Sequence, residues 1–178
     1  LWMEVNAPFN QDGTVWFDSV CLVVGDSDEN HAPNSAFCIN MDDDGWDSKE
    51  NIIEQQYPEH EVCKRGISDY ANCNTMEGFV NDEHSPSHRS LRVDVKSGYR
   101  YHTYIDYKHF VDLNNYPIGT KIKASAYVRI NGDVQVRLGM DFRKAIDDGL
   151  PQKMVNGKII QLNANGPYSI ERTLLTLP

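Results

Sequence analysis

Hydrophobic and polar residues alternate with a period of two in several segments of the chain. The segments 90–96, 121–130 and 134–142 each place apolar side chains on one face of an extended strand and polar side chains on the other. The Asn-Gly-Asp sequence at 131–133 lies between the last two and is typical of a tight turn, so the sequence predicts a hairpin there. The apolar residues predicted to face inward are Leu91, Val93, Val95, Ile122, Ala124, Ala126, Val128, Ile130, Val134, Val136, Leu138, Met140 and Phe142.

Further strands are predicted at 13–24, 99–107, 155–162 and 169–177. No segment shows the pattern of a long amphipathic helix, although 47–56 favours a short helix capped by Ser48. The segment 40–86 is polar and predicts mostly loops. Many short strands separated by turn signals indicate an all-β fold, an antiparallel β-sandwich or barrel.

The composition limits the classes of partner. The chain has 178 residues, enough for one domain with arms or linkers, and a formal net charge of -9. A nucleic-acid partner would need a basic surface, so we expect none. No apolar run is long enough to span a bilayer, and the acidic balance suits a secreted, extracellular protein.

Four cysteines are present, at Cys21, Cys38, Cys63 and Cys73, without a Cys-x-x-Cys pair. We expect two disulfides formed in an oxidising compartment in preference to buried free thiols. Cys63 and Cys73 bracket a polar, turn-prone loop and favour pairing. Cys21 would then pair with Cys38, within one chain or between chains. Four cysteines allow three connectivities, and the sequence does not choose among them.

Two stretches resemble a known family. Ser90-Leu-Arg-Val-Asp-Val95 and Tyr116-Pro-Ile-Gly-Thr-Lys-Ile-Lys-Ala-Ser-Ala-Tyr-Val-Arg129 resemble the middle of the jelly-roll carbohydrate-binding modules that are attached to xylanases and related secreted enzymes. Ile122 departs from the pattern, since the family often has an aromatic residue there. The segment 14–22 resembles the last strand of those modules, and 38–46 resembles their beginning. The resemblance covers about half of the chain and implies a jelly-roll β-sandwich.

Measured against that family, the two ends of the chain stand in reversed order. The tail, 168–178, resembles the penultimate strand of those modules. Residues 13–24, near the start of the chain, resemble the last strand, which in the family follows the penultimate one. Residues 1–24 are therefore predicted to be a strand arm, 25–35 a polar linker and 36–178 the jelly-roll domain. About ten extended residues span roughly 35 Å, so the linker can reach a neighbouring molecule. The apolar residues of the arm are Val15, Phe17, Val20, Leu22 and Val23.

The resemblance also implies a structural calcium ion, held between the beginning of the module and an acidic residue of its last strand. Asp42, Asp43 and Asp44 supply carboxylates at the beginning, and Asp18 occupies the last-strand position. The spacing is not that of an EF-hand. A solvated acidic turn is the alternative.

The polar face of the central strands is the candidate sugar-binding surface, because sugars need aromatic platforms and polar donors on a rigid support. Its residues are Arg92, Asp94, Tyr127, Arg129, Gln135 and Arg137. Tyr127 is the aromatic residue placed on this face, and a charged solvated face or a subunit contact is the alternative.

For function, the leading hypothesis is a non-catalytic structural protein, a filament subunit or repeat unit whose arm completes a neighbouring copy. The competing hypothesis is a carbohydrate-binding module whose arm folds back onto its own domain. The sequence contains no nucleophile elbow, phosphate loop or His-Glu-x-x-His motif, so we expect no enzyme, although a hydrolase or lyase on this fold remains a third class.

Overall fold

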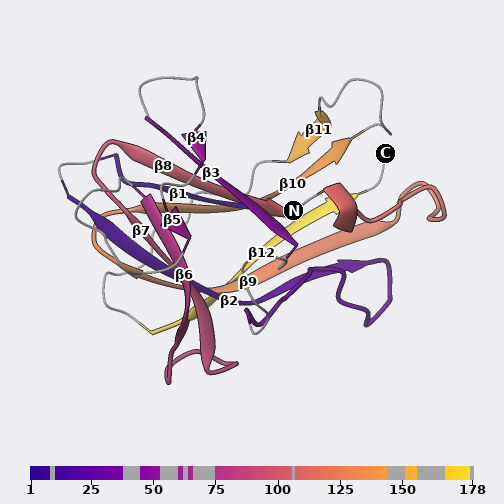
Figure 1. The fold of residues 1–178 in the computed structure, drawn as a ribbon. Coiled ribbons are helices and arrows are strands. Elements are labelled where there is room, and N and C mark those ends of the chain that lie inside the picture. Colours follow the sequence, from indigo (N-terminus) through magenta and orange to yellow (C-terminus); the bar gives the residue numbers. More distant parts are fainter. Residues whose placement is uncertain are drawn as a thin grey trace.

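The computed structural model describes residues 1–8, 11–37, 45–52, 60–61, 64–65, 75–105, 107–143, 151–155 and 167–176. These residues form two β-sheets packed face to face (Figure 1). The predicted all-β fold, an antiparallel β-sandwich, is confirmed. A short 3-10 helix, η3 (Tyr107–His109), follows β8.

Each sheet contains six strands. Sheet A has the order β11 (Pro151–Val155), β10 (Gln135–Arg143), β1 (Trp2–Asn6), β8 (Tyr99–Ile105), β3 (Trp46–Ile52) and β4 (His60–Glu61). Sheet B has the order β12 (Ser169–Thr176), β9 (Lys121–Asn131), β2 (Gly13–Val24), β7 (Arg89–Val95), β6 (Thr75–Asn81) and β5 (Lys64–Arg65). Neighbouring strands are antiparallel, apart from the parallel pair β5 and β6.

The alternating pattern correctly identifies which face of each central strand is buried. The apolar residues of β7 and β9 lie in the core between the sheets, as predicted, and so do Val134, Val136, Leu138 and Met140. Burial of such side chains stabilises a fold by about 1.5–3 kcal/mol each.

The predicted hairpin between β9 and β10 is wrong. The chain turns at 131–134 but passes from sheet B to sheet A, so β9 pairs with β2 and β12, whereas β10 pairs with β1 and β11. Gly132 has a φ of 95°, as a tight turn requires, and its backbone lies against Asp12 and Gly13. The turn residues were therefore recognised correctly, but the partner strands come from elsewhere in the chain.

The predicted short helix at 47–56 is also wrong over residues 47–52, and residues 53–56 lie outside the described residues. Residues 46–52 form β3, which pairs with β8 along its whole length, from Trp46 opposite Ile105 to Ile52 opposite Tyr99. Tertiary pairing thus overrides the local preference of a charged segment. Of the strand predicted at 155–162, Val155 ends β11 and the remainder lies outside the described residues.

The first two strands occupy the centres of the two sheets (Figure 1). β1, which the sequence did not reveal, lies between β10 and β8. β2 lies between β9 and β7 of the same chain. The structure thus shows the arm folded back onto its own domain, which differs from the expectation that it completes a neighbour.

The segment 25–35, expected to be a linker, folds back along β2. The Asn30 side chain accepts a hydrogen bond from the Leu22 amide at 2.8 Å and donates one to the Val20 carbonyl at 2.9 Å. The Val20 amide also donates to the carbonyl of Ser35 at 2.9 Å. These bonds make the segment a surface loop of the domain.

A bulge interrupts β2 between Asp18 and Cys21, where Ser19 has a φ of 48°. Val15, Phe17, Val20 and Leu22 point into the core as expected. Val23 does not, because it is paired with the exposed Lys123 on the outer face of sheet B.

One carboxylate lies inside the sandwich. Glu77 on β6 is 1% exposed and accepts hydrogen bonds from the hydroxyl groups of Tyr101 on β8 and Ser48 on β3, the latter at 2.8 Å. Burial, together with the charge of Glu77 and the hydrogen bond to it, raises the pKa of Tyr101 well above its usual value. The cluster therefore ties sheet B to sheet A through a neutral tyrosine and a buried acid.

Replacing Tyr101 with Phe tests this link. The substitution leaves Glu77 buried without one of its donors, so we expect the free energy of unfolding to fall by about 1–3 kcal/mol. Urea denaturation measures it. Tyr104→Phe, three residues along the same strand and half-buried on the opposite face, is the matched control and should change stability by less than about 0.5 kcal/mol. Equal effects of the two substitutions would contradict a special role for the Glu77 bond.

Candidate functional site

The structure divides the residues predicted to bind sugar between two surfaces. Arg92, Asp94, Tyr127 and Arg129 lie on the outer face of sheet B. Gln135 and Arg137 lie on β10, on the outer face of sheet A. The strand pairing of each sheet shows which residues surround them.

The outer face of sheet A is built from β10, β1, β8 and β3. Arg137, Glu4, His102 and Lys49 lie side by side across these four strands. We call this surface the sheet A face; its residues are Trp2, Glu4, Asn6, Lys49, Arg100, His102, Tyr104, Gln135 and Arg137. Those of β1 were not predicted, although Trp2-Met-Glu-Val-Asn6 shows the same alternation as the longer strands.

Glu4 organises the polar part of this face. Its carboxylate is buried and lies 3.7 Å from Nε of Arg100 and 3.7 Å from Nε of Arg137. Asn6 donates to Glu4 at 3.0 Å and accepts a hydrogen bond from Nε of Arg100 at 3.0 Å. One carboxylate therefore holds two guanidinium groups in place from opposite neighbouring strands.

Aromatic rings lie next to these charges. Trp2 packs flat against Gly139, where a Cβ atom would come within 2.1 Å of the indole ring. The Trp2 and His102 rings meet edge to face with centroids 5.5 Å apart, and the centroid of the Tyr104 ring also lies 5.5 Å from that of His102. The ammonium group of Lys49 lies 5.9 Å from the centre of the Tyr104 ring. Aromatic rings and cations thus share one rigid platform.

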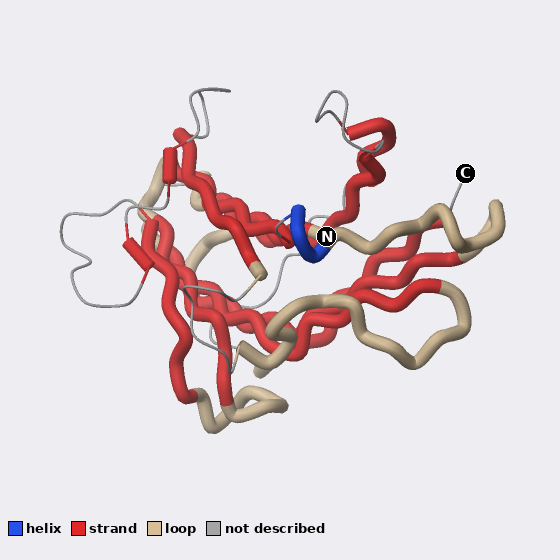
Figure 2. Tube along the Cα trace, turned by 45° about the vertical axis from the view of Figure 1, so that its right-hand side comes forward, coloured by secondary structure: helices blue, strands red, loops and turns tan. Residues whose placement is uncertain are grey.

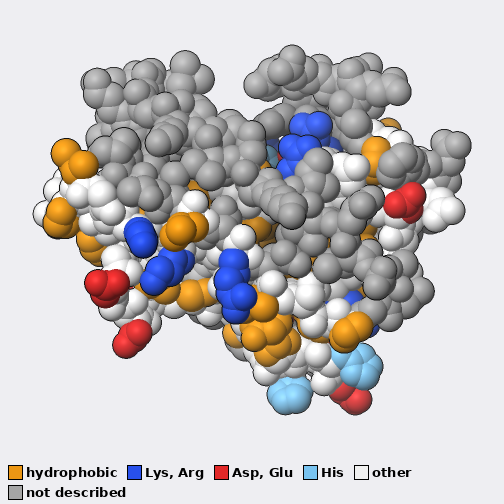
Figure 3. Space-filling view, turned by 180° about the vertical axis from the view of Figure 1, so that it is seen from behind, with side chains coloured by type: hydrophobic (Ala, Val, Ile, Leu, Met, Phe, Trp, Pro, Cys, Tyr) orange, Lys and Arg blue, Asp and Glu red, His pale blue; other side chains and the backbone are white. Residues whose placement is uncertain are grey.

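The sheet A face lies between two raised edges. β4 and β11, at opposite ends of this sheet, both turn to the side away from sheet B (Figure 1 and Figure 2). Seen from behind, one group of Lys and Arg side chains lies near the top of the molecule, on the side of sheet A, and others lie lower, across its middle (Figure 3). An extended ligand lying across the strands would contact this surface.

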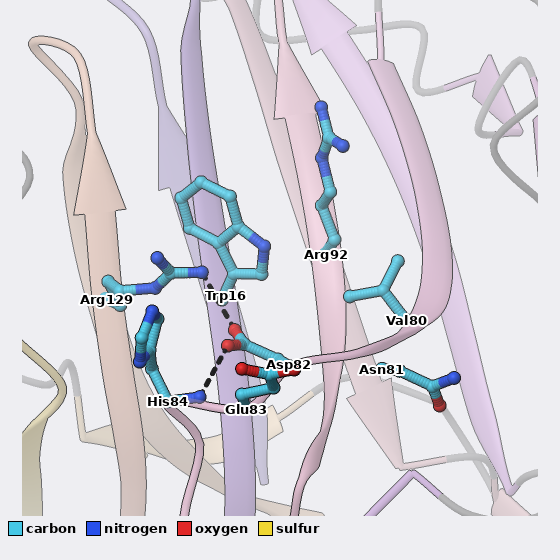
Figure 4. Close-up of a pocket in the computed structure, with 8 residues that line it drawn as sticks. All are labelled: Trp16, Val80, Asn81, Asp82, Glu83, His84, Arg92 and Arg129. Carbon is cyan, nitrogen blue, oxygen red and sulfur yellow. Dashed lines mark hydrogen bonds and ion pairs between the residues drawn. The ribbon is translucent and has the colours of Figure 1, made fainter.

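The outer face of sheet B carries a second group of arginines. Arg92, Trp16 and Arg129 are cross-strand neighbours on β7, β2 and β9. The Arg129 guanidinium lies 4.0 Å from the centre of the Trp16 ring and 5.3 Å from that of Tyr168. Both arginines line a pocket with Trp16 beside the loop that joins β6 to β7 (Figure 4).

Asp82 fixes that loop to the sheet. It accepts hydrogen bonds from Arg129 at 2.8 Å, from the Tyr168 hydroxyl at 2.7 Å and from the His84 amide at 3.0 Å. Burial alone would raise the pKa of Asp82, but the hydrogen bonds from Tyr168 and His84 and the charge of Arg129 hold this pKa below its usual value. Asp82 is therefore an anion at neutral pH.

Asp18 is engaged by the same loop. Its carboxylate accepts hydrogen bonds from the amide and hydroxyl groups of Ser87, at 2.8 and 2.5 Å, and from the Ser19 amide at 2.6 Å. Its predicted calcium partners Asp42, Asp43 and Asp44 lie outside the described residues. Among the residues that the structure describes, no group of three or more acidic, histidine or cysteine side chains is arranged to hold a metal ion.

Cys21 is a free, half-buried thiol on β2, opposite Ser125 of β9. The predicted disulfide between Cys21 and Cys38 within one chain is therefore not formed in this structure. Cys38, Cys63 and Cys73 lie outside the described residues, so the pairing of Cys63 with Cys73 stays a prediction.

Comparison with protein-family models, with curated proteins and with solved structures finds no match to this chain. Within the described part of the chain, no helix has the length and apolar character needed to cross a membrane. Function is therefore inferred from the chemistry of the two outer surfaces.

Asp82 predicts a specific response to acid. Because its pKa is lower in the folded than in the unfolded state, its contribution to stability is complete above the unfolded pKa of about 4 and is lost as the pH falls through the folded pKa. Asp82→Asn should lower stability at pH 7 and reduce the further loss between pH 4 and pH 2, as measured by urea denaturation at each pH. Asp28→Asn, at an exposed loop position, is the control. An unchanged pH profile for Asp82→Asn would contradict the assignment.

Proposed function

We propose that the protein is a non-catalytic extracellular module that binds polysaccharide on the sheet A face. The observation that carries the proposal is the combination, on one platform, of aromatic rings with two guanidinium groups whose outer ends are free. The terminal nitrogens of Arg100 and Arg137 make no hydrogen bond to any residue that the structure describes. Both side chains are about one third exposed, at 35% and 31%.

The geometry suits sugar in three ways. Sugar rings present flat apolar patches that stack on aromatic side chains, and Tyr104 is partly exposed beside the arginines. Sugar hydroxyl groups accept hydrogen bonds from guanidinium groups and donate to amide oxygens such as that of Gln135. Because Glu4 holds both arginines in the absence of ligand, little side-chain freedom remains to be lost on binding.

The resemblance of 90–95 and 116–129 to jelly-roll carbohydrate-binding modules supports the same proposal. Those segments belong to β7, β9 and the loop before β9, which are framework elements of sheet B. The resemblance therefore supports the type of module, and the sheet A face suggests where its ligand binds.

Arg137→Gln tests the proposal. The substitution removes a free guanidinium end, and losing hydrogen bonds from a charged donor should weaken binding by about tenfold or more. Affinity electrophoresis of the whole chain in gels containing soluble xylan, β-glucan or pectin measures retention. Tyr104→Ala should have a similar effect through lost stacking.

Arg172→Gln is the matched control, because Arg172 is exposed on β12 and lies opposite Ser125 on the outer face of sheet B, not on the sheet A face. It should leave retention unchanged. Retention by the unmodified chain on none of these polysaccharides, or equal loss in Arg137→Gln and Arg172→Gln, would reject the sheet A face as the binding site.

A second candidate function is assembly by strand complementation, and one observation favours it. β1 and β2 are contiguous in sequence and central in the two sheets, so their exchange between copies would fill one slot in each sheet. Four large side chains of β2 would carry much of the energy, at about 1.5–3 kcal/mol for each fully buried group. They are Val15, Phe17, Val20 and Leu22.

Refolding at high protein concentration tests this second candidate. Exchange predicts oligomers or filaments of the full chain by size-exclusion chromatography and negative-stain microscopy, because a second copy then competes with the chain's own strands. A chain that lacks residues 1–24 should form none. Compact monomers of the full chain at every concentration would contradict assembly and leave polysaccharide binding unaffected.

A further inference from the structure

The outer face of sheet B contains a pocket that the proposed polysaccharide site does not use. It has a volume of about 410 Å³, within the range of small-molecule sites. The β6–β7 loop forms one wall, and β2, β7 and β9 form the floor (Figure 4). It lies on the opposite sheet from the sheet A face.

The floor of the pocket is rigid. Trp16 is partly exposed there, and Arg129 packs against its ring at 4.0 Å. Arg129 is itself held by Asp82 at 2.8 Å and by the ring of Tyr168. The Asp82 carboxylate is occupied by these contacts, so it positions Arg129 and offers little to a ligand.

Arg92 is different, because one side of its guanidinium group is open. Its Nε and Nη2 donate to Oδ1 of Asp94, at 3.2 and 2.9 Å, and this bond holds the group in a fixed orientation. Asp94 is in turn fixed by Thr14 at 2.6 Å. Nη1 of Arg92 has no hydrogen-bond partner in the described part of the chain, and the side chain is 37% exposed.

The rim of the pocket is polar. Asn81 at the end of β6 and Glu83 and His84 on the β6–β7 loop are exposed and line the cavity. Their amide, carboxylate and imidazole groups suit the hydroxyl groups of a sugar ring. Glu83 repels a doubly charged phosphate more strongly than a singly charged carboxylate, so the rim disfavours a multiply charged ligand.

We infer that this pocket binds a single acidic sugar unit, with the pyranose ring against Trp16 and its carboxylate on Arg92. The ring finds an aromatic platform in Trp16, and the hydroxyl groups find partners on the rim. A carboxylate is the group that best matches a guanidinium end held in a fixed orientation. The molecule then has two binding surfaces on opposite sheets, one for a polysaccharide chain and one for a single acidic sugar unit.

Glucuronate and glucose test the inference, because they share a ring and differ in carrying a carboxylate or a hydroxymethyl group. Titration of the whole chain by calorimetry at low salt should give a dissociation constant about tenfold lower for glucuronate. NMR should show the Trp16 indole signal shifting during the titration, with Trp16→Phe identifying that signal. Arg92→Gln should abolish the preference, and Arg92→Lys should retain part of it through charge alone.

Arg137→Gln is the control on the other face and should leave the glucuronate preference unchanged. The inference is overturned if glucuronate binds no better than glucose, if the preference survives in Arg92→Gln, or if it disappears in Arg137→Gln instead. The melting temperature of each variant shows whether a loss reflects the pocket or the fold. If Arg92→Gln does not fold, the shift of the Trp16 signal in the unmodified chain decides the question.

Discussion

The pairing of β1 and β2 with later strands is the constraint on which the rest of the structure depends. Neither sheet is continuous without them, because β1 joins β10 to β8 and β2 joins β9 to β7. The sandwich core is built around their inward side chains, including Met3, Val5 and Phe17, all of which are fully buried. The two outer surfaces depend on the same strands, since Glu4 organises one and Trp16 forms the floor of the other.

Carboxylates perform the same physical task at three places in the molecule. Glu4 holds Arg100 and Arg137, Asp82 holds Arg129, and Asp94 holds Arg92. Each of these acids is buried and each arginine is more exposed than its partner. The chain is acidic overall, yet some of its carboxylates are buried and hold arginine side chains in place at the surface. The sign of the net charge is therefore a poor guide to what these surfaces present to a ligand.

The sequence predicts where the strands of this fold lie better than it predicts which strands pair with each other. Alternation correctly located β7, β9 and β10, because a strand with one buried face must alternate. The prediction that β9 and β10 pair with each other was wrong. A turn motif shows that the chain changes direction, but it does not show which sheet the next strand joins. Alternation also missed β3, whose charged residues favour a helix until β8 provides a partner.

The candidate sites were predicted only in part, for a related reason. The alternation identified Arg92, Arg129 and Arg137 as residues of a polar strand face. The sequence predicted that they share one surface, whereas the structure places them on the outer faces of two different sheets. Gln135 and Arg137 were separated from Arg129 by the crossing at 131–134. The residues that complete each surface, Glu4 and Trp16, come from the first strands, more than seventy positions away in sequence from the arginines they contact. Periodicity within a segment carries no information about such contacts.

The central position of β2 has a consequence for the synthesis of the chain. More than sixty residues, from Val24 to Arg89, must be made before its first partner strand begins to emerge, and β9 follows later still. At roughly 5–20 residues per second, a strand rich in Val, Leu and Phe waits several seconds on the ribosome with both backbone edges open. Such a nascent chain needs protection from premature pairing, and its folding is expected to be completed after synthesis, because its principal contacts are long-range.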